Sequence, residues 1–169
     1  MSNIESSLRF NLDEIGKFGI GLWHQRPETP PLDWNAVIPE TMLGPFDWTM
    51  EAYEVAILCF CSELNVPAYL AQRDNPVPLV PPVAAVWASF SLLQGYFVLG
   101  AIVDVSHEVC WHEPMRAGDP VQLAGKITEK YEKRGRHYLV WDTHCTRPNG
   151  TAVFDVRHTI IDLSVMEVV

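Results

Sequence analysis

The chain has 169 residues, about the length of one globular domain. Hydrophobic residues make up 48% of it and charged residues 20%, a usage that excludes wholesale disorder. Its 12 basic and 21 acidic residues give a net charge of −9, which argues against binding to nucleic acid or to an anionic membrane surface. No apolar stretch approaches the roughly 20 residues of a membrane span, and the N-terminus lacks an apolar signal core. We therefore expect a cytoplasmic protein with no membrane contact.

The first 45 residues are loosely patterned and rich in proline. We predict that residues 1–45 form a short helix followed by an extended arm, and that residues 46–169 form a single domain. Trp23, Trp34 and Trp48 lie in or beside this arm. We expect these large aromatic side chains either to form a lid over a bulky ligand or to anchor the arm to the domain.

A first helix is predicted at the start of the domain. Apolar residues recur at helical spacing after Thr49, which is the predicted N-cap. The helix should end near residues 62–65, because Pro67 follows and the position before a proline disfavours helix. A loop is predicted over residues 64–81, where prolines and an Asn-Pro pair interrupt the pattern.

The second predicted helix opens at Pro81 and Pro82, since proline is tolerated in the first turn. Apolar residues follow at steps of three and four up to Phe97, and Gly100 is the predicted end. Residues 83–103 include no charged side chain. A helix without a charged face is buried on most sides, so we expect this one at the centre of the domain.

After this helix the hydrophobic period changes from 3.6 to 2, which is typical of strands. The predicted strands cover residues 102–113, a stretch that starts at Val121, residues 138–146 and residues 152–163. On the first strand, Asp104 and Glu108 are expected to share a face with His112, and His107 to lie on the other face. A sheet that wraps one buried helix covers the apolar faces of both, so the predicted fold class is α+β.

The four cysteines do not have the spacing of a zinc or redox site. Only one residue separates Cys59 from Cys61, and His144 and Cys145 are adjacent, so they would point to opposite faces of a strand. We expect free thiols, no metal site and no cofactor.

Three stretches of the chain resemble the MaoC-like dehydratases and (R)-specific enoyl-CoA hydratases. They are Thr49–Tyr69 with its Ser-Glu-Leu-Asn-Val-Pro-Ala-Tyr end, Leu79–Ala84 with its Pro-Pro pair, and His112–Asp119 continuing into Gly125–Tyr131. With the strands that follow, the resemblance spans about residues 47–161. The branch it resembles includes the dehydratase region of fungal fatty acid synthase and the mycobacterial hydroxyacyl-ACP dehydratase subunits.

The resemblance implies a hot-dog fold, an antiparallel sheet wrapped around a central helix. It also implies a role with acyl thioesters of CoA or acyl carrier protein (ACP), in which water is added to a 2-enoyl thioester or removed from a 3-hydroxyacyl thioester. This chemistry needs an acid/base pair, and N–H groups that hold the thioester oxygen as charge develops on it. Members of this fold normally bury one sheet edge and half of the cleft against a second copy. We therefore expect a homodimer, or a heteromer with another hot-dog subunit.

The family's catalytic motif is degenerate in this chain. Glu63 stands near the family's Asp position, Asn65 is retained, and Tyr69 stands at the His position. A glutamate can replace an aspartate as base, and a tyrosine can donate a proton. Tyrosine, with an ordinary pKa of about 10, is however a poor base near neutrality. Glu63, Asn65 and Tyr69 are the candidate catalytic residues.

The resemblance also implies a substrate-binding region at the start of the central helix. A helix N-terminus suits a thioester oxygen because its N–H groups are unpaired and its dipole is positive. A cluster of basic residues in a predicted hairpin turn either contacts the phosphates of a CoA or carrier arm or is a solvated tip. The candidate binding residues are Pro81, Pro82, Val83, Ala84, Lys133, Arg134 and Arg136.

Two functions stay open. The chain is either a hydratase or dehydratase of acyl thioesters, or a non-catalytic acyl-binding or scaffolding subunit that partners a catalytic MaoC-like protein. A thioesterase of the same fold ranks last, since it would need a carboxylate on or beside the central helix, and the predicted helix has none.

Overall fold

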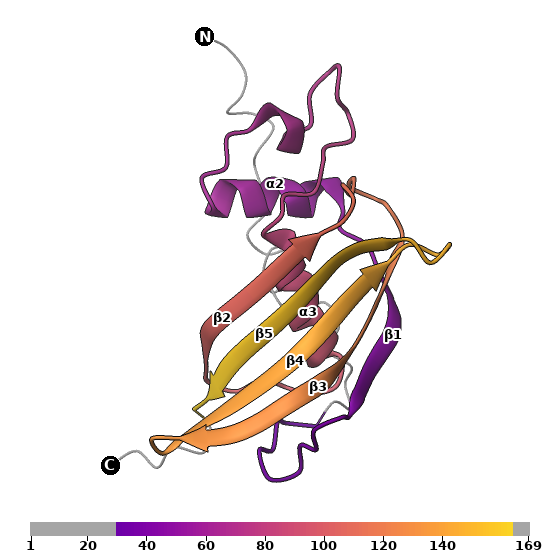
Figure 1. Cartoon of the computed structure of the whole chain (residues 1–169). Coiled ribbons are helices and arrows are strands. Elements are labelled where there is room, and N and C mark those ends of the chain that lie inside the picture. The colour runs from indigo at the N-terminus through magenta and orange to yellow at the C-terminus, as the bar shows by residue number, and fades with distance from the viewer. Residues whose placement is uncertain (1–29, 164–169) are drawn as a thin grey trace.

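The structure, a computed structural model that describes residues 30–163, is a five-stranded antiparallel sheet curved around one helix, α3 (Figure 1). The strand order is β1-β3-β4-β5-β2. The elements are β1 (Met42–Trp48), α2 (Ala52–Cys61), the 3-10 turn η1 (Pro67–Tyr69), α3 (Ala84–Gln94), β2 (Ile102–Trp111), β3 (Val121–Lys133), β4 (Arg136–Thr146) and β5 (Ala152–Asp162). The predicted α+β architecture is confirmed. Within residues 30–163, no helix combines the length and apolarity needed to cross a membrane.

The core lies between α3 and one face of the sheet. Small and aliphatic residues of α3 pack against Trp141 and other fully buried side chains of β4 and β5. Two hydrogen bonds pair polar groups at this contact: Oγ of Ser89 lies 3.0 Å from Oγ1 of Thr143, and Nε1–H of Trp141 donates to the carbonyl oxygen of Ser89. Buried polar groups without partners would be costly, so these bonds make it possible for the uncharged helix to contain serine.

Helix α2 differs from the prediction at its start, and α3 differs at both ends. Helix α3 begins at Ala84 with Val83 as the N-cap, whereas a start at Pro81 and Pro82 was predicted. The N-cap of α2 is Glu51, not Thr49: its N–H donates to Oε2 of Glu54, which completes a capping box. The end of α3 is Gln94, with Gly95 as the C-cap, whereas Gly100 was predicted. The chain leaves the helix early because Val98 pairs with the segment that starts at residue 30.

The N-terminal arm is anchored to the domain. Trp34 and Trp48 are buried, and Lys130 Nζ donates to the carbonyl oxygens of Trp34 and Val37 while lying 5.2 Å from the centre of the Trp34 ring. Trp34 and Trp48 therefore act as anchors rather than as a lid; Trp23 and the predicted short helix lie outside the described residues. Strand β1 was not predicted, and it crosses the expected boundary between residues 45 and 46.

An irregularity in β2 changes which side chains share a face. The register with β5 shifts between Asp104 and Ser106, so that Val105 is an extra residue. Asp104 therefore lies on the same face as His107, and not on the face of His112 as simple alternation predicted.

All four cysteines are free, and burial raises the pKa of the Cys145 thiol to about 12.

Candidate functional site

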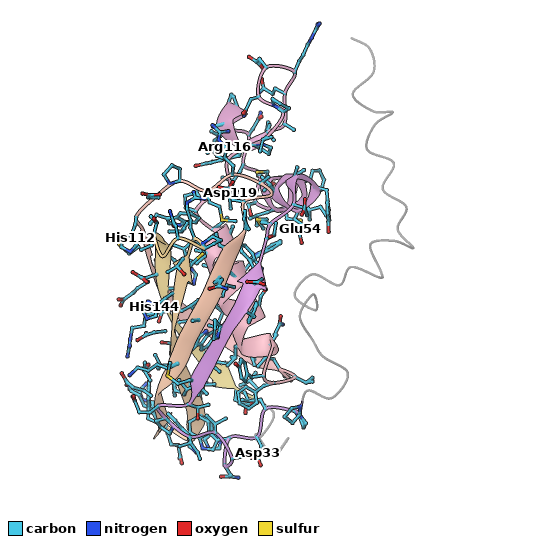
Figure 2. The ribbon with its side chains drawn as sticks, turned by 90° about the vertical axis from the view of Figure 1, so that its right-hand side faces the viewer. Asp33, Glu54, His112, Arg116, Asp119 and His144 are labelled. Carbon is cyan, nitrogen blue, oxygen red and sulfur yellow. The ribbon has the colours of Figure 1, made fainter. Side chains whose placement is uncertain are left out.

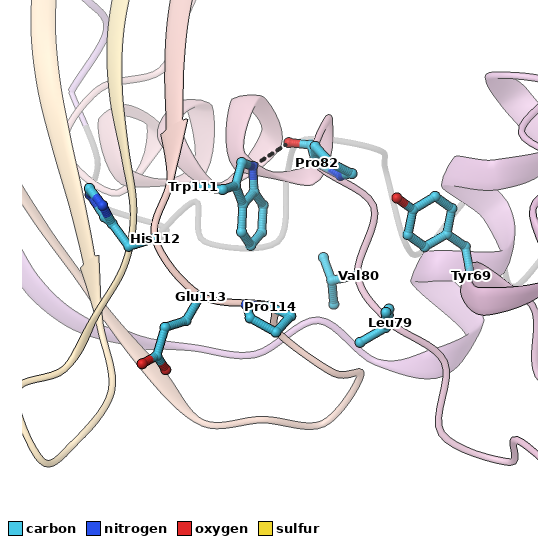
Figure 3. A pocket seen from close by; sticks show the side chains of 8 residues that line it. All are labelled: Tyr69, Leu79, Val80, Pro82, Trp111, His112, Glu113 and Pro114. Atoms are coloured by element: carbon cyan, nitrogen blue, oxygen red, sulfur yellow. Dashed lines mark hydrogen bonds between the residues drawn. The ribbon is translucent and has the colours of Figure 1, made fainter.

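A pocket of about 320 Å³ opens between η1, the start of α3 and the end of β2 (Figure 3). Its walls are mostly apolar. The lining residues are Tyr69, Leu79, Val80, Pro82, Trp111, His112, Glu113 and Pro114. A concave apolar site with a few polar groups is the usual setting for a small-molecule ligand, so this pocket is the candidate functional site.

The third family-like stretch holds the loop that forms one wall. The N–H of Val80 donates to the carbonyl oxygen of Met115, and the Arg116 guanidinium donates to the carbonyl oxygen of Val77 at 2.8 Å. The N–H of Arg116 also donates to Oδ2 of Asp119, which closes the turn. Figure 2 shows Arg116 and Asp119 near α2, at one end of the sheet. These bonds explain why the pocket wall depends on residues far along the chain.

Few polar groups point into the pocket. The Tyr69 hydroxyl is directed toward Pro82, and Trp111 donates its Nε1–H to the carbonyl oxygen of Pro82 at 3.1 Å (Figure 3). The side chains of His112 and Glu113 line the rim but turn away from the interior. Tyr69 is therefore the polar lining side chain best placed to meet a ligand.

The structure brings only one of the three motif residues to the pocket. Glu63 and Asn65 are exposed and do not line it, while Tyr69 is half-buried in its wall. Glu63 has a φ of 53°, a left-handed conformation at the turn that follows α2. Glu63 therefore does not line the pocket in this chain.

The start of α3 borders the pocket but offers few free donors. The N–H groups of Ala84 and Ala85 already donate to the carbonyl oxygens of Pro81 and Pro82, and prolines have no N–H. Pro82 lines the pocket, whereas Val83 is partly exposed beside it and Pro81 and Ala84 are buried. The first turn of the helix is therefore closed on itself by short-range bonds.

The basic residues of the hairpin do not join the pocket. Lys133 pairs with Arg136 at the tip of the β3–β4 hairpin, with Arg134 in the turn between them. This tip lies at the opposite end of the sheet from α2 and η1 (Figure 1). Within one subunit, these cations and Tyr69 cannot contact the same small ligand.

A cluster that the sequence did not reveal lies on the sheet face turned away from α3 (Figure 2). Nε2 of His112 and Nδ1 of His144 each lie 2.6 Å from an oxygen of Asp155. Burial raises the pKa of Asp155, but the hydrogen bonds and charges of both histidines outweigh it, so the pKa is lowered overall. His144 and Asp155 come from β4 and β5, and His112 directly follows β2, so only the strand register could have shown that they meet.

The comparisons with known proteins agree with the fold. A family model described as "FAS1-like, dehydratase domain region" matches residues 66–156, more than half of the chain. The match begins at η1 and includes the pocket wall, α3 and most of the sheet. No curated protein matches the chain in sequence.

Solved structures with the same architecture are distant in sequence. A chain of the C-terminally truncated HadBC (3R-hydroxyacyl-ACP dehydratase) complex from Mycobacterium tuberculosis is similar, with a TM-score of 0.64 and 18% identity over 75% of this chain and 98% of that one. The R-hydratase PhaJ1 from Pseudomonas aeruginosa has a TM-score of 0.61 and 11% sequence identity, with 79% of this chain and 87% of that chain covered. A chain of the ChsH1–ChsH2 complex from M. tuberculosis has a TM-score of 0.58 and 8% sequence identity, with 75% of this chain and 98% of that chain covered. At these identities the likeness shows the fold.

The class of protein is therefore a hot-dog domain with a pocket at the start of its central helix. The chain belongs to the family of FAS1-like dehydratase regions, and the predicted relation to MaoC-like hydratases and dehydratases is confirmed.

Proposed function

We propose that the chain is one subunit of a heteromeric hydratase or dehydratase of acyl thioesters, and that a second hot-dog subunit supplies the acid/base pair. The reaction interconverts a 2-enoyl thioester plus water with a 3-hydroxyacyl thioester. One observation carries the proposal: of the three motif residues, only Tyr69 lines the pocket. The substrate is a CoA or ACP thioester, and the proposal invokes no cofactor.

The chemistry explains why a partner is needed. Hydration requires a general base for the water and a proton donor for the α-carbon, both within hydrogen-bonding reach of the substrate. The Tyr69 hydroxyl can donate a hydrogen bond to a thioester oxygen or to a water molecule, but a phenol is a poor base near neutrality. Glu63 is outside the pocket, and His112 is turned toward Asp155. The pocket of this chain therefore suits binding and orientation better than proton transfer.

Strand β2 offers the surface for such a partner. It is an edge strand that pairs only with β5 in the described chain, and most of its residues are exposed on both faces. Val103, Val105 and Val109 are among the exposed large hydrophobic residues. A long edge strand with exposed valines invites pairing with another strand, so we assign the partner to this edge. The HadBC and ChsH1–ChsH2 structures are both complexes, which supports a heteromer.

The proposal is tested by the hydration of crotonyl-CoA, followed as loss of enoyl absorbance in the presence of EDTA. Three samples are compared: the full chain, a MaoC-like subunit of the same genome that retains the Asp/His motif, and the two co-purified. We expect the co-purified pair to exceed this chain alone by at least about a hundredfold, the contribution of an acid/base group.

Two results would overturn the proposal. Turnover by this chain alone at the rate of the pair would place the acid/base groups in this chain and favour a homodimer. A pair no faster than the motif-bearing subunit alone would show that this chain adds nothing to the reaction.

A further inference from the structure

The bulge in β2 brings together three side chains that could share a metal ion. His107 lies directly opposite His158 of β5, and Asp104, moved to the same face by the extra Val105, lies opposite Ile160. Because residues 158 and 160 of β5 share a face, the Asp104 side chain reaches diagonally to His158. Bulges commonly redirect a side chain in this way.

The distances are those of a ligand set. Nε2 of His158 lies 3.1 Å from Oδ1 of Asp104, and Nδ1 of His107 lies 3.7 Å from Oδ2 of the same carboxylate. One ligand atom from each residue can be chosen so that all lie within 4.8 Å of one another. In a tetrahedral zinc site with bonds of about 2.0–2.1 Å, neighbouring ligand atoms are about 3.3 Å apart. The two measured separations lie on either side of that value, but they end on different oxygens of Asp104. Rotation of the exposed Asp104 and His107 side chains is needed to bring one oxygen and both nitrogens around one ion.

The surroundings hold one ligand rigidly and leave the others accessible. His158 is fully buried, with its ring stacked on Trp141 at 4.4 Å and packed against the edge of Phe90 at 4.4 Å. The side chains of Asp104 and His107 are 39% and 44% exposed, which gives an ion a path to the site.

We propose that Asp104, His107 and His158 form a binding site for a divalent transition metal of the zinc class, with two imidazole nitrogens and one carboxylate oxygen. Imidazole suits zinc, cobalt, nickel and copper better than magnesium or calcium. The site is separate from the pocket, which borders the other end of β2 at Trp111, and it does not rest on the proposed hydratase function. Asp104 and His107 are exposed in the single chain, so the titration below uses this chain without the partner proposed for the edge of β2.

One atom sets the expected strength of binding. Nδ1 of His158 is buried and has no hydrogen-bond partner among the described residues. Metal on Nε2 would place the ring proton on Nδ1, where no carboxylate or carbonyl receives it. A hydrogen-bond acceptor for the second ring nitrogen of a metal-binding histidine typically raises metal affinity about 10- to 100-fold. Because His158 has none among the described residues, we expect this site to bind metal about 10- to 100-fold more weakly than a site in which every histidine has such an acceptor.

The test uses the full chain, without an affinity tag and stripped with EDTA, titrated with Co²⁺ and then with competing Zn²⁺. We expect about one equivalent of Co²⁺ per chain with the visible absorption bands of a low-coordinate site, and loss of those bands on adding Zn²⁺. His107→Gln and Asp104→Asn should each weaken binding at least about tenfold. Both residues are exposed, so these variants should fold, which circular dichroism verifies.

The matched control is His144→Gln, which removes a histidine beside a carboxylate on the opposite face of the sheet. It should leave the Co²⁺ bands and stoichiometry unchanged. Absence of a bound equivalent would overturn the proposal, and so would binding that His107→Gln and His144→Gln alter equally, since that would show adventitious surface binding. The hydration assay is run in EDTA, so its failure and the failure of the metal site are distinguishable.

Discussion

Burial of His158 should make the stability of this domain depend on pH in a way that one substitution removes. Burial, the largest effect, lowers the pKa of His158; the charge and hydrogen bond of Asp104 raise it in part, and His107 lowers it again. The unfolded chain takes up a proton on this histidine near pH 6.5, the ordinary value, whereas the folded chain does so only at a lower pH. Between these two pKa values the unfolded state binds more protons than the folded state.

The free energy of unfolding should therefore fall as the pH is lowered below about 6.5. The slope from a single group is at most about 1.4 kcal/mol per pH unit, and the full contribution of a neutral His158 is present above pH 6.5. Domains are commonly stable by only about 5–15 kcal/mol, so a change from pH 6.5 to 5.5 should be measurable. The assay is urea unfolding of the full chain in EDTA at several pH values between 7.5 and 5.5.

The variant His158→Gln keeps an amide N–H for Asp104 but cannot titrate. We expect it to be less stable at pH 7.5, because Gln fills the space between Phe90 and Trp141 less well than the ring does. Its free energy of unfolding should nevertheless fall less steeply between pH 6.5 and 5.5 than that of the wild type. Equal slopes for the two proteins would refute the explanation, since the pH dependence would then come from other groups.

Three further substitutions test other parts of the structure. Gly125→Ala would place a Cβ 1.9 Å from the carbonyl oxygen of Asp142, which is a steric clash. The free energy of unfolding, measured by urea titration, should therefore fall by at least about 2 kcal/mol, and a loss under ~1 kcal/mol would contradict this. Tyr69→Phe removes only a hydroxyl, and the co-purified pair should lose about a hundredfold in hydration rate with no change in melting temperature; an unchanged rate would exclude a role for that hydroxyl. Val109→Lys should abolish co-purification with the partner, because it places a charge on the exposed edge of β2. The control Ile38→Lys, at a more exposed apolar site outside β2, should still co-purify. If both variants co-purify with the partner, the interface does not lie on β2.

The main architecture could be predicted because its signals are local. The change of hydrophobic period after the uncharged helix, and the glycine-containing turns, predicted strands at the positions of β2 to β5. The expected meander was wrong for β2, which pairs with β5 and not with β3, because this pairing joins strands that are far apart in the chain. Strand β1 was missed because Gly44 and Pro45 interrupt it. Proline is tolerated in a strand at the edge of a sheet, and the edge position of β1 is a property of the whole sheet that a sequence window does not contain.

The candidate site was only partly predictable, for a related reason. Tyr69 and Pro82 were identified from short motifs, and the fold brings them to one pocket. The exposed position of Glu63 depends on a left-handed turn after α2. The position of Asp104 beside His158 depends on the single-residue bulge at Val105, which strict alternation excludes. Such irregularities arise from tertiary packing and strand register, and one sequence does not reveal them.

The central claim is that the acid/base pair lies outside this chain. The most direct measurement is the rate of crotonyl-CoA hydration by the co-purified pair with one subunit altered at a time. We expect Glu63→Gln in this chain to leave the rate within about twofold of the wild type, and replacement of the motif histidine in the partner to abolish it. Loss of hydration in Glu63→Gln, with the folded pair still assembled, would contradict the claim and assign the base to this subunit.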